Sequence, residues 1–261
     1  MADRAAFMFN RVPKVTVAFW LIKLMAVTMG ETAADYLAVN LGLGLSTTSW
    51  IMVAVLAVAL ILQFAQKKYV PWPYWLAVVL ISVVGTLVTD NLVDNFGVKL
   101  ETTVIVFTVL LGATFAVWYG IERTLSIHTI FTTRREVFYW LAILFTFALG
   151  TAVGDWASEK IGIGYVATGA IFAAIIAVVT AAYYAGKIDG ILTFWIAYIL
   201  TRPVGASLGD LLSQPIEYGG LGFGTIVTSA IFLACIALIV VYMTLRHELE
   251  TAPASAGVEA E

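Results

Sequence analysis

A pattern of three residues recurs four times along this chain and constrains its fold more than any other feature. A Trp is followed ten residues later by a Gly and fifteen residues later by an Asp. The four copies begin at Trp20, Trp75, Trp140 and Trp195 and end at Asp35, Asp90, Asp155 and Asp210. The same spacing in four places indicates an internal fourfold repeat.

The composition places these repeats in a membrane. The chain is 61% hydrophobic and only 12% charged, whereas about a quarter of the residues in a soluble domain are charged. Apolar stretches of about 20 residues recur along the whole length, which is typical of a polytopic membrane protein. Because these stretches lack the alternation of barrel strands, we expect the membrane spans to be helices.

We therefore predict an all-α polytopic membrane protein with eight transmembrane helices arranged as four two-helix hairpins. The predicted helices are 15–38, 46–66, 73–93, 103–121, 137–158, 165–185, 191–212 and 224–245. The repeats are about 15–66, 73–121, 137–185 and 191–245, within a single transmembrane domain at 1–250, and 251–261 is a disordered tail. The second helix of each repeat is almost purely apolar, so we expect these helices to form an outer shell that faces lipid or covers the others.

Basic residues predict the orientation. Under this topology, only Lys99 and Lys160 fall on one side of the membrane, and the other Lys and Arg residues near the ends of the spans fall on the opposite side. The side with more Lys and Arg is the cytoplasmic one, so both termini are expected in the cytoplasm. Aromatic residues gather on that same side, and we interpret the repeat Trp residues as anchors in an interfacial belt.

The four Asp residues are predicted to reach a similar depth. A helix rises about 1.5 Å per residue, so each Asp lies roughly 22 Å beyond its Trp, in the outer third of the hydrocarbon slab. Acidic groups are unfavourable there unless they have a function. Glu31 lies one turn before Asp35, and its counterparts in the second and third repeats are Thr86 and Thr151. Ser207 is one position further along in the fourth.

Two basic residues lie within the predicted spans. Lys23 is three residues after Trp20, where it can extend to the cytoplasmic interface. Arg202 lies seven residues after Trp195, which is too deep for that, and we expect a buried Glu31–Arg202 ion pair. Pro203 predicts a break or a kink in the seventh helix.

The repeat Gly residues predict close helix packing. Gly30, Gly85, Gly150 and Gly205 each precede a small or polar residue four positions later, a spacing that allows membrane helices to approach closely. Packing of these helices would bring the Asp residues toward one central region. A ring of four and two separate pairs both remain open, and the Gly-Thr shared by the second and third repeats favours pairs.

These residues favour cation transport. Carboxylates accompanied by hydroxyls, with no His or Cys at the same level, are ligands for a hard cation such as manganese. Carboxylates held close together also share protons, which suits proton-coupled export. The predicted metal ligands are Glu31, Asp35, Asp90, Asp155 and Asp210, and the predicted path also includes Thr86, Thr151, Ser207 and Arg202, the last paired with Glu31 in one state.

Two other hypotheses remain open. In the first, the same acids belong to a transporter of a small organic cation. In the second, the chain is a structural or partner-binding membrane protein without transport. Each Asp would then cap a local turn near Gly42, Gly97 or Gly162.

The spans contain no Ser-His or Cys-His arrangement, so we expect no enzyme and no catalytic residue. The expected partners are the lipid bilayer and the cation, with no nucleic acid and no cofactor, and the oligomeric state is open.

Several segments carry a resemblance to a known family. They are Gly-Glu-Thr-Ala-Ala-Asp at 30–35, Gly-Thr-Leu-Val-Thr-Asp-Asn-Leu at 85–92, Thr-Thr-Arg-Arg-Glu at 132–136, Thr-Phe-Ala-Leu-Gly-Thr-Ala-Val-Gly-Asp at 146–155 and Arg-Pro-Val-Gly-Ala-Ser at 202–207. The chain resembles, over essentially its whole length, a bacterial family of uncharacterised membrane-anchored proteins with four tandem repeats of two transmembrane segments and a recurrent Trp. The resemblance implies an eight-helix, multi-pass protein of the bacterial inner (cytoplasmic) membrane, without implying an activity.

Overall fold

Helices account for all the regular structure in the part of the chain that is described. The structure is a computed structural model that describes residues 10–251, and these contain no strand. The long helices are α2 (Val17–Asp35), α3 (Leu45–Phe64), α4 (Pro71–Asp90), α5 (Leu100–Glu122), α6 (Thr133–Asp155), α7 (Tyr165–Tyr184), α8 (Gly190–Ser213) and α9 (Thr225–Thr251). Eight helices in this part of the chain are long and apolar enough to cross a membrane, which confirms the predicted fold class. Apart from Thr251, the predicted disordered tail lies outside the described residues.

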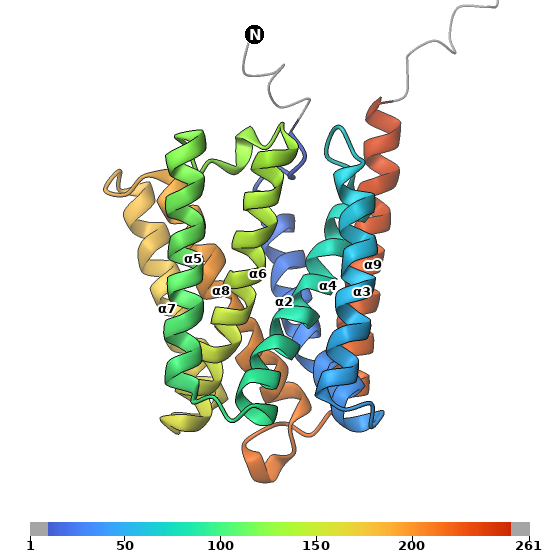
Figure 1. The fold of residues 1–261 in the computed structure, drawn as a ribbon, viewed down its shortest axis with the longest axis vertical. Coiled ribbons are helices and arrows are strands. Elements are labelled where there is room, and N and C mark those ends of the chain that lie inside the picture. The colour runs from blue at the N-terminus through green and yellow to red at the C-terminus, as the bar shows by residue number, and fades with distance from the viewer. Residues whose placement is uncertain (1–9, 252–261) are drawn as a thin grey trace, which may run out of the picture.

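The eight helices form two layers (Figure 1). Helices α2, α4, α6 and α8 lie inside, and 56–72% of the residues in the most apolar part of each span are buried. Helices α3, α5, α7 and α9 lie outside, where only 6–17% are buried. The outer helices are almost purely apolar because lipid is their main neighbour. This confirms the predicted division between an inner set and an outer shell.

The inner helices close into a ring. Helix α2 packs on α4, α4 on α6, α6 on α8 and α8 on α2. Each repeat Gly lies against the next helix of the ring, where a Cβ would collide: Gly30 with Ser82, Gly85 with Phe147, Gly150 with Arg202 and Gly205 with Val27. The interpretation of the shared Gly-Thr as a sign of pairs is therefore wrong, because the Gly contact is the same at all four interfaces.

The outer helices link neighbouring repeats. Each packs chiefly on the inner helix of the following repeat, with α3 on α4, α5 on α6 and α7 on α8, and α9 closes the circle on α2. The predicted order of the helices along the chain is thus correct. The prediction that the two helices of one repeat pack together as a hairpin is wrong, because each outer helix packs chiefly on the next repeat. An inner helix already has two ring neighbours, and the outer helix that covers it comes from the repeat before it. This interlocking holds the first and last repeats together.

Three of the inner helices end in the same unusual way. A π-helical turn follows the repeat Asp directly in η1 (Tyr36–Asn40), η2 (Asn91–Asn95) and η4 (Trp156–Lys160). The N–H of Leu41, for example, donates to the carbonyl of Tyr36 at 2.9 Å. Such turns are frequent at functional sites. Helix α8 has no such turn and runs through Pro203 without a break, so of the predicted break or kink the break does not occur.

An aromatic layer fills the ring near the end where α2 begins. Trp75, Trp140 and Trp195 are buried inside the bundle, so their interpretation as interfacial anchors is wrong, whereas Trp20 is only partly buried. The residue before each Trp is also aromatic, which directs a second ring inward from every inner helix. The layer comprises Phe19, Trp20, Tyr74, Trp75, Tyr139, Trp140, Phe194, Trp195 and Tyr198, whose rings contact one another. The hydroxyls of Tyr74 and Tyr139 lie 2.6 Å apart within it.

Residues 10–16 cover the same end of the ring. Asn10 and Val12 are only 3% exposed, and the Asn10 side-chain amide donates to the carbonyl of Ile127 at 3.1 Å. Arg11 forms an ion pair with buried Glu136 at 2.6 Å. The first helix begins and the last helix ends at this end of the bundle, the upper end in Figure 1. The ring is therefore closed here, and the repeat Asp residues lie toward the opposite end.

Candidate functional site

The ring interior carries its polar groups at fixed levels. Positions four residues apart share a helix face, and positions 7, 11 and 15 after each Trp follow this rule. The second of these positions is occupied by Glu31, Thr86, Thr151 and Ala206, and the third by the four Asp residues. Arg202 occupies the first position in the fourth repeat. The repeat spacing thus orders charged groups along the inside of the ring.

Arg202 joins all four inner helices. Its side chain is fully buried, and Nη1 lies 2.9 Å from Oε2 of Glu31 on α2, so the predicted ion pair is confirmed. Nη2 donates to the hydroxyls of Thr86 on α4 and Thr151 on α6, the latter at 2.7 Å. Gly150 makes this possible, because a Cβ there would lie only 2.2 Å from Arg202 Cγ. We call Glu31, Thr86, Thr151 and Arg202 the central cluster.

Three carboxylates meet next to the central cluster. Glu31, Asp155 and Asp210, from α2, α6 and α8, each offer an oxygen, and these oxygens all lie within 4.8 Å of one another. Glu31 and Asp210 are buried, and Asp155 is partly buried. This separation is short enough for one ion to contact all three after small side-chain movements. We call these residues the three-carboxylate group.

The other two predicted ligands lie outside this group. Asp35 is partly buried and accepts a hydrogen bond of 3.4 Å from Gln214. Asp90 is also partly buried, and both interact electrostatically with Glu31. Glu31 precedes Asp35 by one turn and represents the first repeat in the group. Asp35 and Asp90 therefore add negative charge nearby without being brought into the same group.

Ser207 takes no part in the central cluster. It is buried, and a Cβ built on Gly169 of α7 would lie 3.6 Å from Ser207 Cβ. Ser207 therefore faces the outer helix α7. The residue of α8 at the level of Glu31 is Ala206, and one further residue turns the side chain about 100° away. Ser207 therefore lies outside the central cluster, and its place in a path stays a prediction.

Local capping does not account for the Asp residues. Asp35, Asp90 and Asp155 each precede a π-helical turn, and none of them makes a side-chain capping hydrogen bond to it. The turns beyond them instead use Gly42, Gly97 and Gly162 at φ values of 68°, 65° and 80°. Glycine adopts these values without strain. The carboxylates of these three Asp residues are therefore not used as caps of the turns.

Lys23 is buried. The prediction that its side chain extends to the interface is therefore wrong. Its side chain is fully enclosed, and Nζ donates to the carbonyl of Tyr198 at 2.6 Å. The ammonium lies 4.0 Å from the Tyr198 ring centroid and 5.6 Å from that of Phe147. Lys23 points into the ring because it lies on an inner face of α2. The aromatic layer closes the ring at that end.

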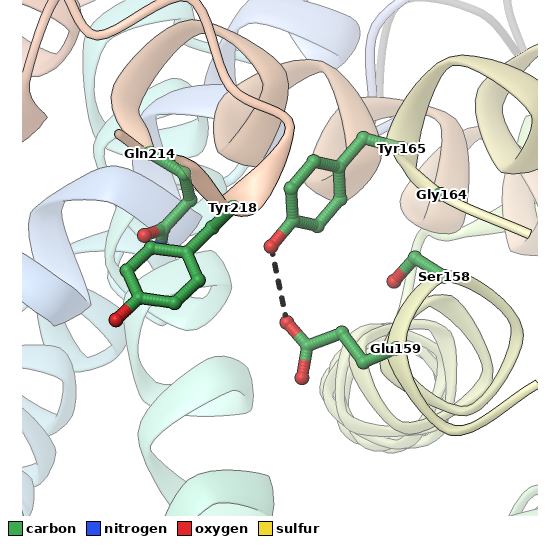
Figure 2. Close-up of a pocket in the computed structure, with 6 residues that line it drawn as sticks. All are labelled: Ser158, Glu159, Gly164, Tyr165, Gln214 and Tyr218. Carbon is green, nitrogen blue, oxygen red and sulfur yellow. Dashed lines mark hydrogen bonds between the residues drawn. The ribbon is translucent and has the colours of Figure 1, made fainter. Parts of the chain in front are cut away.

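A pocket opens at the Asp end of the bundle. Figure 2 shows Tyr165, Tyr218 and Glu159 around it, with the Tyr165 hydroxyl donating to Glu159 at 3.3 Å. This end pocket has a volume of about 480 Å³ and is lined by Ser158, Glu159, Gly164, Tyr165, Gln214 and Tyr218. Gln214 also bonds to Asp35, and Tyr165 interacts electrostatically with Asp155 and Asp210. The pocket therefore adjoins the acidic region of the ring.

A signal in the sequence points to this pocket, one helical turn beyond the repeat Asp. Four residues after the repeat Asp stand Val39, Asp94, Glu159 and Gln214. Three of these four are polar, and two of them line the end pocket. Extending the four-residue series by one turn identifies them.

A closed ring of four spanning helices, with charged groups inside and an apolar shell outside, defines a multi-pass membrane protein built from internal repeats. The chain belongs to the family described as Repeat of Unknown Function (DUF347), whose model matches residues 18–69, 73–124, 138–188 and 193–248. These four matches follow the predicted repeats and confirm the resemblance to a four-repeat family. No curated protein and no solved structure matches the chain.

Proposed function

We propose that this protein is a secondary transporter of a divalent hard cation, similar to manganese, and that it couples export to protons. The observation that carries the proposal is the meeting of Glu31, Asp155 and Asp210 within 4.8 Å inside a bundle of membrane spans. Such a grouping is unfavourable in an apolar slab unless it serves a function. Oxygen ligands of this kind suit a hard cation.

Charge at the site supports a divalent ion. While Arg202 is paired with Glu31, three ionised carboxylates and one guanidinium carry a net charge of about −2, which attracts a divalent cation. The hydroxyls of Thr86 and Thr151 add neutral oxygens one level away. Carboxylates at this separation also share protons, and an arriving cation would displace them. These features favour exchange of a metal ion for protons.

The two ends of the ring differ in a way that suits transport. The end pocket gives access from the Asp side, while the aromatic layer and residues 10–16 close the other side. Parallel repeats around a shared site are an established transporter architecture. The distribution of Lys and Arg favours the cytoplasm for the closed end. On this assignment, the protein lies in the bacterial cytoplasmic membrane and releases the cation outward.

A small organic cation is a second candidate substrate because of the end pocket. Its volume of about 480 Å³ lies in the range that small organic ligands occupy. Two Tyr rings and the Glu159 carboxylate surround it (Figure 2), and aromatic faces attract organic ammonium groups. The ammonium would reach the three-carboxylate group from this pocket.

Flux measurements in liposomes test both substrates. We expect purified protein in liposomes to move manganese across the membrane in response to an imposed pH gradient, with saturation and with competition from other divalent cations. Protein-free liposomes are the control. A flux of methylammonium that manganese does not inhibit would support the second candidate. If neither ion moves under either direction of the gradient, the transport proposal is wrong.

A further inference from the structure

Lys23 is a buried cation without a carboxylate partner. Within residues 10–251 it forms no ion pair, and its one hydrogen bond goes to the carbonyl of Tyr198. An ammonium has three protons to donate, so this environment satisfies it poorly. Aromatic faces compensate only in part. A residue held in this way at the centre of a membrane bundle calls for a functional explanation.

A short chain of contacts connects Lys23 to the three-carboxylate group. Lys23 and Arg202 lie on the Phe147 ring, with the ammonium 5.6 Å and the guanidinium 5.9 Å from its centroid. The two positive charges repel each other. Arg202 in turn pairs with Glu31, and Glu31 belongs to the three-carboxylate group. A change of charge at Lys23 is therefore felt at the carboxylates through Arg202.

The two basic residues differ in chemistry. Arginine stays charged in proteins, whereas lysine exchanges its proton when it is buried. Arg202 is thus a fixed charge and Lys23 a variable one. When Lys23 is protonated, it repels Arg202 toward Glu31, and Arg202 then pairs with the Glu31 carboxylate. A neutral Lys23 allows Arg202 to withdraw, which releases Glu31 to bind a cation.

We propose that Lys23 carries a proton that is exchanged for the transported cation, with Arg202 as the moving link between the two sites. This inference rests on the proposed cation transport and names its coupling group. When the cation binds Glu31, Asp155 and Asp210, Arg202 shifts toward Lys23, and the Lys23 ammonium gives up one proton, which is released from the protein to the solution. When a proton returns to the Lys23 amine, Arg202 pairs with Glu31 again and the cation leaves. One proton is released for each divalent cation bound, so each exchange changes the charge of the protein by +1.

The surroundings of Lys23 contain few competing groups. Helix α8 presents Tyr198 and Arg202, and α4 and α6 contribute Tyr74 and Tyr139 to the aromatic layer. Helix α9, which packs on the other side of α2, has no charged residue between Thr225 and Val241. Its one titratable side chain there is Cys235. Arg202 is therefore the one other basic side chain among the groups just named that surround Lys23.

The inference is tested by counting the protons released when the purified protein binds manganese in weakly buffered detergent solution. Lys23→Met should release one proton fewer per ion than the wild type and should bind manganese about tenfold more tightly, because one positive charge is removed. Lys23→Arg should also release one proton fewer but should bind more weakly. Lys99→Met is the control, since Lys99 is exposed at the start of α5, and should match the wild type.

The possible results separate the two proposals. Equal proton release by Lys23→Met, Lys99→Met and the wild type would overturn the role of Lys23 and leave the transport proposal intact. No manganese binding by the wild type would overturn the transport proposal, and the coupling role with it. If Lys23→Met does not fold, Lys23→Gln, which retains a donor for the Tyr198 carbonyl, gives the same count.

Discussion

Replacement of Arg202 by Met is expected to lower the free energy of unfolding by about 3–5 kcal/mol, the typical cost of removing one partner from a buried ion pair. The side chain is fully buried and contacts three other helices through Glu31, Thr86 and Thr151. Its removal leaves the Glu31 carboxylate buried without its cation. It also removes a side chain that joins all four inner helices.

A second substitution should recover most of that loss. In the double variant Glu31→Gln with Arg202→Met, no charge of the pair remains unpaired. Replacing a whole buried pair is often close to neutral. We therefore expect the double variant to be more stable than Arg202→Met alone in chemical unfolding followed in detergent micelles. If both variants unfold at the same denaturant concentration as the wild type, Glu31 and Arg202 do not form the buried pair described above.

The second large effect concerns the cation ligands. Asp155→Asn and Asp210→Asn each remove one carboxylate of the three-carboxylate group, and we expect the two substitutions together to weaken manganese binding by roughly 100-fold or more. Asn keeps the size and polarity of Asp, so the fold should be retained. Binding is measured by calorimetry on the purified protein, and transport by flux in liposomes.

Matched variants make this prediction specific. Asp94→Asn removes the same kind of charge from an exposed residue at the same end of the molecule and should leave binding nearly unchanged. Asp90→Asn should have an intermediate effect, because Asp90 lies outside the three-carboxylate group but interacts with Glu31. Manganese transport that is unchanged in Asp90→Asn and Asp155→Asn would refute the assignment of these acids to the ion path.

Much of the fold follows from the sequence because its signals are repeated. Fourfold spacing and apolar length predict eight spans in two layers, and the confirmed helices agree within a few residues. The order of packing does not follow, because the Gly residues indicate close contact without indicating which neighbour is contacted. The burial of Trp75, Trp140 and Trp195 was also missed. Helix depth alone places a Trp near an interface, but the aromatic residue before it shows which face is packed.

The parts of the candidate site that follow from the sequence are those where the depth of a residue in the membrane determines its partner. Arg202 is too deep to reach water, so its pairing with Glu31 could be derived from spacing alone. Lys23 is shallower, and its burial depends on the aromatic layer contributed by other repeats. Ser207 lies outside the central cluster because one residue turns a side chain about 100° around the helix. The end pocket depends on the π-helical turn η4 and the loop after α8, which repeat spacing does not describe.

Anomalous diffraction from crystals grown with manganese is the most direct measurement of whether acids from separate repeats hold one ion. We expect a single strong peak between the carboxylates of Glu31, Asp155 and Asp210, with Arg202 moved away from Glu31. The absence of a peak there at saturating manganese, or a peak only beside Glu159 in the end pocket, would contradict the central claim.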